Sequence, residues 1–134
     1  MADLVFDQAI SLPYAYTAGA MHRAALTALR EGRLIGSTNG AYTAVPAAPF
    51  APDGAHLRET VELPTTGTLE AATVAHHLPG APALGLIRLA GASQPLLHRL
   101  GGGAEALAPG ALVRAVWRDE RSGSIDDVEH FAPA

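Results

Sequence analysis

The sequence contains no cysteine and no lysine, and each absence excludes a class of function. Without a thiol the chain cannot form a disulfide, a thiolate zinc site or a cysteine nucleophile. Its nine basic residues are all arginines, spread along the chain, against thirteen acidic residues, which leaves a net charge of −4. Because nucleic-acid binding depends on clustered basic side chains that neutralise phosphates, we do not expect a nucleic-acid partner.

Long apolar runs and aromatic side chains are also scarce. No stretch approaches the roughly 18 apolar residues of a membrane span. The N-terminal segment MADLVFDQAISLPYAY is acidic and lacks the basic-then-apolar order of a signal peptide. We therefore expect a cytoplasmic protein without a membrane partner. Of the 134 residues 49% are hydrophobic but only 5% aromatic, which predicts a folded chain with an aliphatic core.

One amphipathic helix is predicted near the N-terminus, over Thr17–Glu31. Apolar residues recur there at helical spacing and form a single stripe. The residues of this stripe are Met21, Ala25, Leu26 and Leu29. Thr17 is a suitable N-cap and Gly32 a suitable stop, so these two residues are expected to bound the helix.

The next segment, residues 33–64, changes in character. It carries several prolines and Gly or Asn turn signals, which are too frequent for a long helix or a wide sheet. Short hairpins at Ala41–Val45 and Leu57–Leu63, joined by a proline-rich turn, fit this pattern.

From residue 66 onward the pattern is β. Five runs of strand length are separated by turn clusters rich in Gly, Pro and Ser. The runs are Leu69–His77, Ala83–Leu89, Pro95–Leu100, Ala111–Arg118 and Ser124–Phe131. Five short strands of this spacing match a small barrel such as an OB-fold, and Gly103–Pro109 is long enough for a short helix between the third and fourth strands.

These pieces together resemble the acyl-CoA-associated OB-fold family, long classed as a domain of unknown function, which pairs a rubredoxin-like zinc ribbon with an OB barrel. The resemblance is carried by PYAYTAGAMHRAALTALREGRLIGS, GTLEAATV, ALGLIRLAGASQPLLHRL and LAPGALVRAVWRDERSGSIDDVEHFAP, in this order. It implies a mainly β chain with an N-terminal arm and helix at 1–32, a ribbon at 33–64 and a five-stranded OB-fold barrel at 65–134.

The chain departs from this family at the ribbon. Family members hold a tetrahedral zinc with two C-x2-C pairs. Those positions correspond to Ser37, Gly40, Ala51 and Gly54, none of which binds zinc well. We therefore expect no metal or other cofactor. We expect a metal-free knuckle, rigidified by its prolines and packed by Tyr42, Val45, Phe50 and Leu57.

The resemblance also implies a function. Family members pair with a thiolase-like protein that supplies the catalytic residues, so the chain is expected to be an accessory subunit and no enzyme by itself. Because thiolases dimerise, a two-plus-two heterotetramer is the expected stoichiometry. The acyl-CoA substrate would bind through the partner and undergo acyl transfer or retro-aldol cleavage. The PYAYTAG opening is most similar to members found beside steroid-type aldolases.

The arm and the ribbon are expected to form much of the docking surface, so deletion of the residues before Thr17 should weaken association. Aromatic residues are enriched at interfaces, and a histidine in a half-buried strand can face a partner. The predicted partner-contact residues are Tyr14, Tyr16, Phe50 and His98.

No self-contained catalytic site is predicted. The sequence lacks a nucleophile elbow, a dinucleotide fingerprint and a zincin motif, and Gly101-Gly102-Gly103 is a barrel loop because a phosphate loop needs a lysine. His76-His77 is interpreted as a strand-end pair with one ring packed and one solvated. The acidic run 125–129 is interpreted as a solvated strand face, in which His130 could pair with Asp126 or Asp127.

Two other functions stay open at this point. A stand-alone acyl-CoA binder would bind a CoA thioester without a partner. An OB-fold that binds single-stranded nucleic acid or an oligosaccharide would need stacking aromatics over a cationic groove, which the composition does not favour.

Overall fold

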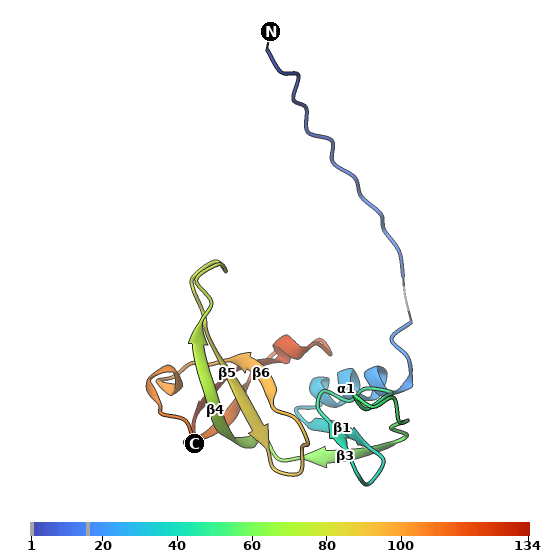
Figure 1. Cartoon of the computed structure of the whole chain (residues 1–134), viewed down its shortest axis with the longest axis vertical. Helices are drawn as coiled ribbons and strands as arrows, with labels where there is room; N and C mark the ends of the chain where they lie inside the picture. The colour runs from blue at the N-terminus through green and yellow to red at the C-terminus, as the bar shows by residue number, and fades with distance from the viewer. Residues whose placement is uncertain (1, 16) are drawn as a thin grey trace.

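The computed structural model describes residues 2–15 and 17–134 (Figure 1). One helix is followed by a three-stranded sheet and then by a five-stranded sheet, so the mainly β architecture with an N-terminal helix is as predicted. Residues 2–15 belong to no helix or strand. Figure 1 shows them as an arm that leads away from the folded body.

The helix, α1, spans Ala20–Arg30 and packs on the three-stranded sheet. Ala25, Ala28 and Leu29 are buried, whereas Leu26 of the predicted stripe is exposed. The predicted N-cap is wrong, because the helix begins after Gly19 and no side chain caps its first turn. No helix in the part of the chain that the structure describes is long and apolar enough to cross a membrane.

The helix ends as predicted at Gly32, which adopts a positive φ of 75°. The N–H of Gly32 donates to the carbonyl of Leu29 at 3.0 Å, and the N–H of Arg33 donates to that of Ala28 at 2.8 Å. This pair of bonds is a Schellman motif, which satisfies carbonyls at the helix end.

The three-stranded sheet is antiparallel and has the order β2-β1-β3. Its strands are β1 (Leu34–Thr38), β2 (Thr43–Ala44) and β3 (Glu59–Leu63). The hairpins expected at Ala41–Val45 and Leu57–Leu63 are each a single strand, β2 and β3, and both pair with β1. The sequence pattern misses this central strand, because Gly36 and Ser37 interrupt its apolar run. Glycine is needed at position 36, since a Cβ atom there would lie 2.6 Å from the carbonyl oxygen of Ala44.

The five-stranded sheet is also antiparallel, with the order β6-β5-β4-β7-β8. Its strands are β4 (Thr66–Val74), β5 (Ala83–Leu89), β6 (Leu96–Arg99), β7 (Leu112–Trp117) and β8 (Val128–Pro133). Each of the five predicted runs overlaps a strand, although β4 begins before its run, β8 ends after its run, and the last run opens with a 3-10 turn, Ile125–Asp127. The short helix expected between the third and fourth strands is a 3-10 turn at Ala104–Ala106.

The sheet curls so that its edge strands β6 and β8 approach each other. They meet at one parallel bridge, Leu100–Phe131, where the N–H of Gly101 donates to the carbonyl of Phe131 at 2.9 Å. The strands form no longer ladder there, so the OB-fold is a partly open barrel. Its interior is mostly aliphatic, as the composition predicts, with Phe131 as its largest fully buried side chain.

The two sheets share one core, and hydrogen bonds from the β5–β6 loop connect the second sheet to the first. The N–H of Thr43 donates to Ser93 Oγ at 2.8 Å, and the N–H of Ser93 donates to the carbonyl of Thr43 at 2.9 Å. Gln94 accepts from the hydroxyl of Tyr42 at 2.7 Å and donates to the carbonyl of Val45 at 3.0 Å. Val45 belongs to the main core, which spans both sheets and the helix.

Candidate docking surface

Six large apolar side chains of the N-terminal arm are exposed to solvent, with exposed fractions from 75% to 89%. They are Leu4, Val5, Phe6, Ile10, Leu12 and Tyr14. Burial of one such side chain stabilises a protein or a complex by about 1.5–3 kcal/mol. An exposed cluster of this kind is typical of a segment that binds another surface.

An apolar groove of about 320 Å³ lies beside α1, at the point where the arm joins the body. Its lining residues are Ala18, His22, Ala25, Leu26, Leu29, Pro46 and Ile125. The exposure of Leu26, which a core stripe would bury, is explained by its place in this groove. Ala18 lies between the arm (residues 2–15) and α1, so the groove lies at the base of the arm, and we call the arm and the groove together the docking surface.

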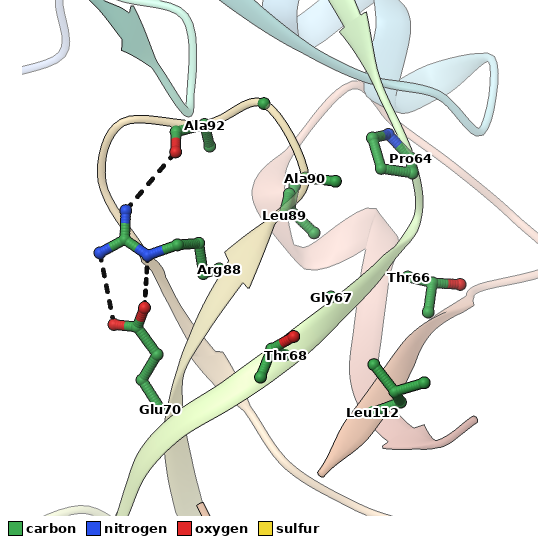
Figure 2. Close-up of a pocket in the computed structure, with 11 residues that line it drawn as sticks. Pro64, Thr66, Gly67, Thr68, Glu70, Arg88, Leu89, Ala90, Ala92 and Leu112 are labelled. Carbon is green, nitrogen blue, oxygen red and sulfur yellow. Dashed lines mark hydrogen bonds and ion pairs between the residues drawn. The ribbon is translucent and has the colours of Figure 1, made fainter. Parts of the chain in front are cut away.

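A larger concavity of about 620 Å³ lies on the outer face of β4 and β5 (Figure 2). Figure 2 shows the Arg88 guanidinium between the Glu70 carboxylate and the Ala92 carbonyl, which are bonded to it at 3.4 Å (Nη2–Oε2) and 3.5 Å respectively. The hydrogen bond with Glu70 raises the pKa of Arg88. Because Glu70 neutralises this guanidinium, the concavity has little charge with which to attract the phosphates of CoA.

The four predicted contact residues lie in different settings. Tyr14 is exposed in the arm, and Tyr16 lies outside the described residues. Phe50 is 51% exposed, and its ring lies 4.8 Å from that of His56, centroid to centroid. His98 is buried. Contact with a partner stays a prediction for all four, and the structure gives His98 a structural role.

His98 ties β6 to the loop between β7 and β8. Its Nδ1 accepts from the N–H of Arg99 at 2.9 Å, so Nε2 carries the proton and donates to the carbonyl of Ile125 at 3.2 Å. Its ring packs edge-on against Phe131. Burial lowers the pKa of His98, although the bond to Ile125 acts in the opposite direction. The imidazole is therefore neutral at neutral pH.

Asp127 overturns the interpretation of the acidic run as a solvated face, because it is buried. Its carboxylate accepts from the backbone N–H groups of Ser122, Gly123 and Ser124 at 2.8, 2.7 and 3.1 Å. Burial acts to raise the pKa of Asp127, but these bonds act against it, and the net pKa lies below the ordinary value. Asp127 thus holds the β7–β8 loop closed.

The other histidine predictions need correction. His76 and His77 are both exposed in the turn after β4, so neither ring is packed as expected. His130 faces Glu129, with Nδ1 4.0 Å from Oε2, and not Asp126 or Asp127. Gly101 packs under the His130 ring, since a Cβ atom there would lie 2.7 Å from it.

The ribbon positions that hold zinc in the resembled family do not fit a metal ion here. Ser37 is buried, and its hydroxyl donates to the carbonyl of Ala48 at 2.5 Å and accepts from the Ala48 N–H at 2.8 Å. Gly40, Ala51 and Gly54 offer no side-chain ligand. Among the described residues, no three His, Asp or Glu side chains gather closely enough to hold a metal.

The packing of the ribbon differs in part from the prediction. A small apolar core lies between its turns, formed by Ala44, Ala51 and Leu57, with Tyr42 partly buried against it. Leu57 and Tyr42 therefore pack as expected. Val45 instead joins the main core, and Phe50 is exposed.

The comparisons with known proteins agree with this fold. A family model described as "ChsH2, C-terminal OB-fold domain" matches residues 60–118, which run from β3 to just after β7. No curated protein matches the chain significantly.

Two solved structures are similar to the chain. One is the crystal structure of a protein of unknown function from the DUF35 family of Sulfolobus solfataricus, 16% identical with a TM-score of 0.64 over 87% of this chain and 85% of that chain. The other is a chain of the Ltp2-ChsH2(DUF35) aldolase, 23% identical with a TM-score of 0.62 over 82% of this chain and 91% of that chain. At these identities the two structures establish a common fold.

Proposed function

We propose that the chain, whose residues 60–118 match the family model of a ChsH2 OB-fold domain, is a member of the DUF35 family of acyl-CoA-associated OB-fold proteins and a non-catalytic accessory subunit of a thiolase-superfamily enzyme. The complex acts on an acyl-CoA thioester, either by retro-aldol cleavage of a steroid-type side chain or by acyl transfer. The partner supplies the reacting groups, and no metal or cofactor takes part.

The observation that carries this proposal is the docking surface. The arm exposes six large apolar side chains, and an apolar groove lies at its base beside α1. The likeness to a chain of an aldolase supports the same conclusion. The buried polar residues Ser37, His98 and Asp127 are all bonded to backbone groups and hold the fold together.

In such a complex the subunit contributes positioning. Association buries the arm and groove and stabilises the bound form of both proteins by mass action. Loops of the partner that border its substrate entrance become ordered in the same step. Correct placement of the reacting groups accelerates a reaction without a catalytic residue from this chain.

The geometry favours this function over stand-alone ligand binding. The concavity on β4 and β5 has its one arginine, Arg88, paired with Glu70, which leaves no free cation there for a phosphate. Phe131 lies inside the barrel and Trp117 packs against the core, so neither aromatic ring is placed as a stacking platform for a base.

The test is co-expression of the chain with the thiolase-like protein encoded nearest to it, followed by native-mass measurement. We expect a stable two-plus-two complex, to which each copy of this chain contributes 13.8 kDa. Cleavage or acyl transfer of a CoA thioester should require both chains.

A chain that remains a separate species beside the partner, with acyl-CoA present, would contradict the proposal. Isothermal titration of the chain alone with acyl-CoA is the matched control, because tight binding without a partner indicates a free-standing carrier.

A further inference from the structure

The arm has the side-chain pattern of a β-strand, although no strand is formed there. Apolar side chains occupy even-numbered positions, at Leu4, Phe6, Ile10, Leu12 and Tyr14, and Gln8 is the one polar residue in this series. Odd-numbered positions carry Asp3, Asp7, Ala9, Ser11 and Pro13, with Val5 as the one large apolar exception. A period of two is the pattern of a strand with one buried face.

A helix does not explain this pattern. At 100° per residue the apolar side chains of the arm would point to all sides of a helix and form no stripe. Pro13 would also interrupt the helix, whereas an extended chain accommodates it.

The folded body offers no sheet edge of matching length. Its edge strands have two residues in β2, five in β3, four in β6 and six in β8. The alternating pattern of the arm runs from residue 4 to residue 14, well beyond any of these strands. The arm also leads away from both sheets (Figure 1). Its acceptor is therefore expected on another molecule.

We propose that the arm binds the partner enzyme by adding a strand to an exposed edge of a partner sheet, with its even-numbered face in an apolar groove there. This inference rests on the proposed function, which supplies the partner. Strand addition combines main-chain hydrogen bonds, which give affinity, with pockets for alternate side chains, which give specificity. Burial of the even-numbered face buries no charge, because Asp3 and Asp7 lie on the opposite face.

Proline defines which main-chain groups pair with the partner. In a strand, the N–H and C=O of successive residues point to opposite sides of the chain. Pro13 has no N–H to donate, so we place the main-chain N–H and C=O groups of odd-numbered residues on the edge of the strand that faces away from the partner strand. The N–H groups of even-numbered residues, Gln8 among them, therefore donate to the partner strand.

Two neighbouring proline substitutions in the full-length chain test this directly. Gln8→Pro removes an N–H that faces the partner, and Ala9→Pro removes one that faces away. Gln8→Ala controls for loss of the glutamine side chain. Both positions are exposed and outside every helix and strand, so folding of the body should be unaffected.

Each variant is titrated against the wild-type thiolase-like partner by biolayer interferometry, and its Kd is compared with that of the wild-type chain. Gln8→Pro should raise the Kd about tenfold or more, because a main-chain acceptor on the partner loses its donor. Ala9→Pro and Gln8→Ala should change it by less than about threefold, since neither removes a pairing group.

If Gln8→Pro and Ala9→Pro change the Kd equally, strand addition is overturned. The proposed function still holds in that case, because the wild-type chain binds the partner. Failure of the wild-type chain to bind the partner would overturn both. A native mass of the lone chain equal to two copies, reduced to one by Gln8→Pro, would assign the arm to a second copy of this chain and overturn the partner assignment.

Discussion

Among the residues that the structure describes, Asp127 is the one buried carboxylate, and three backbone N–H groups donate to it. We expect Asp127→Asn to lower the free energy of unfolding by about 1–3 kcal/mol, because at least one of these N–H groups loses its acceptor. The exposed neighbour provides a matched control, Asp126→Asn, which should change stability by less than about 0.5 kcal/mol. Urea denaturation at pH 7 measures both, and equal effects would contradict the assigned role.

His98 makes stability depend on pH near neutrality. Its pKa is lowered by burial, so the unfolded chain takes up this proton at a higher pH than the folded chain. The stabilisation is complete above the unfolded pKa of about 6.5 and is lost as the pH falls through the lower folded pKa. We expect the urea midpoint of the wild type to decrease from pH 7 to pH 5, and that of His98→Gln to decrease less. Parallel profiles would show that another group dominates.

At the scale of elements, the ribbon keeps its shape by side-chain packing and backbone bonds. Ser37 bonds both backbone groups of Ala48, and Leu57 fills the small core beside it. We therefore expect EDTA to leave the urea midpoint of the purified protein unchanged, and plasma emission spectroscopy to find no stoichiometric zinc. One zinc per chain, or a lower midpoint in EDTA, would contradict a metal-free ribbon.

The five barrel strands could be predicted because each shows alternation or an apolar run between clear turn signals. Strand β1 could not be predicted in this way. The backbone of Ala44 lies so close to position 36 that only glycine fits there, and a glycine contributes no apolar side chain to a strand pattern. The spacing of residues also does not predict that Asp127 is buried, for a similar reason. Three consecutive N–H groups of a turn surround it, and a turn geometry of that kind leaves no mark in residue spacing.

At the scale of the whole molecule, the arm lies outside what stabilises the fold. Residues 2–15 are exposed and belong to no helix or strand, while the core is built from α1 and the two sheets. The sequence indicated the arm as a contact segment. The groove beside α1 could not be predicted, because its lining joins Leu26, Pro46 and Ile125 from three distant segments.

Deletion of residues 1–16 should therefore separate folding from binding. We expect the truncated chain to keep its free energy of unfolding to within about 0.5 kcal/mol, because none of the described residues that are removed, 2–15, belongs to the core. Its affinity for the thiolase-like partner should fall at least about tenfold, which corresponds to 1.4 kcal/mol. Native mass and titration measure the second effect. Undiminished affinity would restrict the interface to the folded body.

The seam of the barrel offers a measurement of a different kind. The seam is the gap between the edge strands β6 and β8, and the hydrogen bond from the N–H of Gly101 to the carbonyl of Phe131 crosses it. The amide hydrogen of this glycine exchanges with solvent deuterium when the seam opens, while amides within the β4–β5 ladder require the sheet itself to separate. The ratio of the two exchange rates thus reports the population of an open barrel in the intact molecule. If this ratio changes when a second protein is added, binding of that protein alters the opening of the barrel.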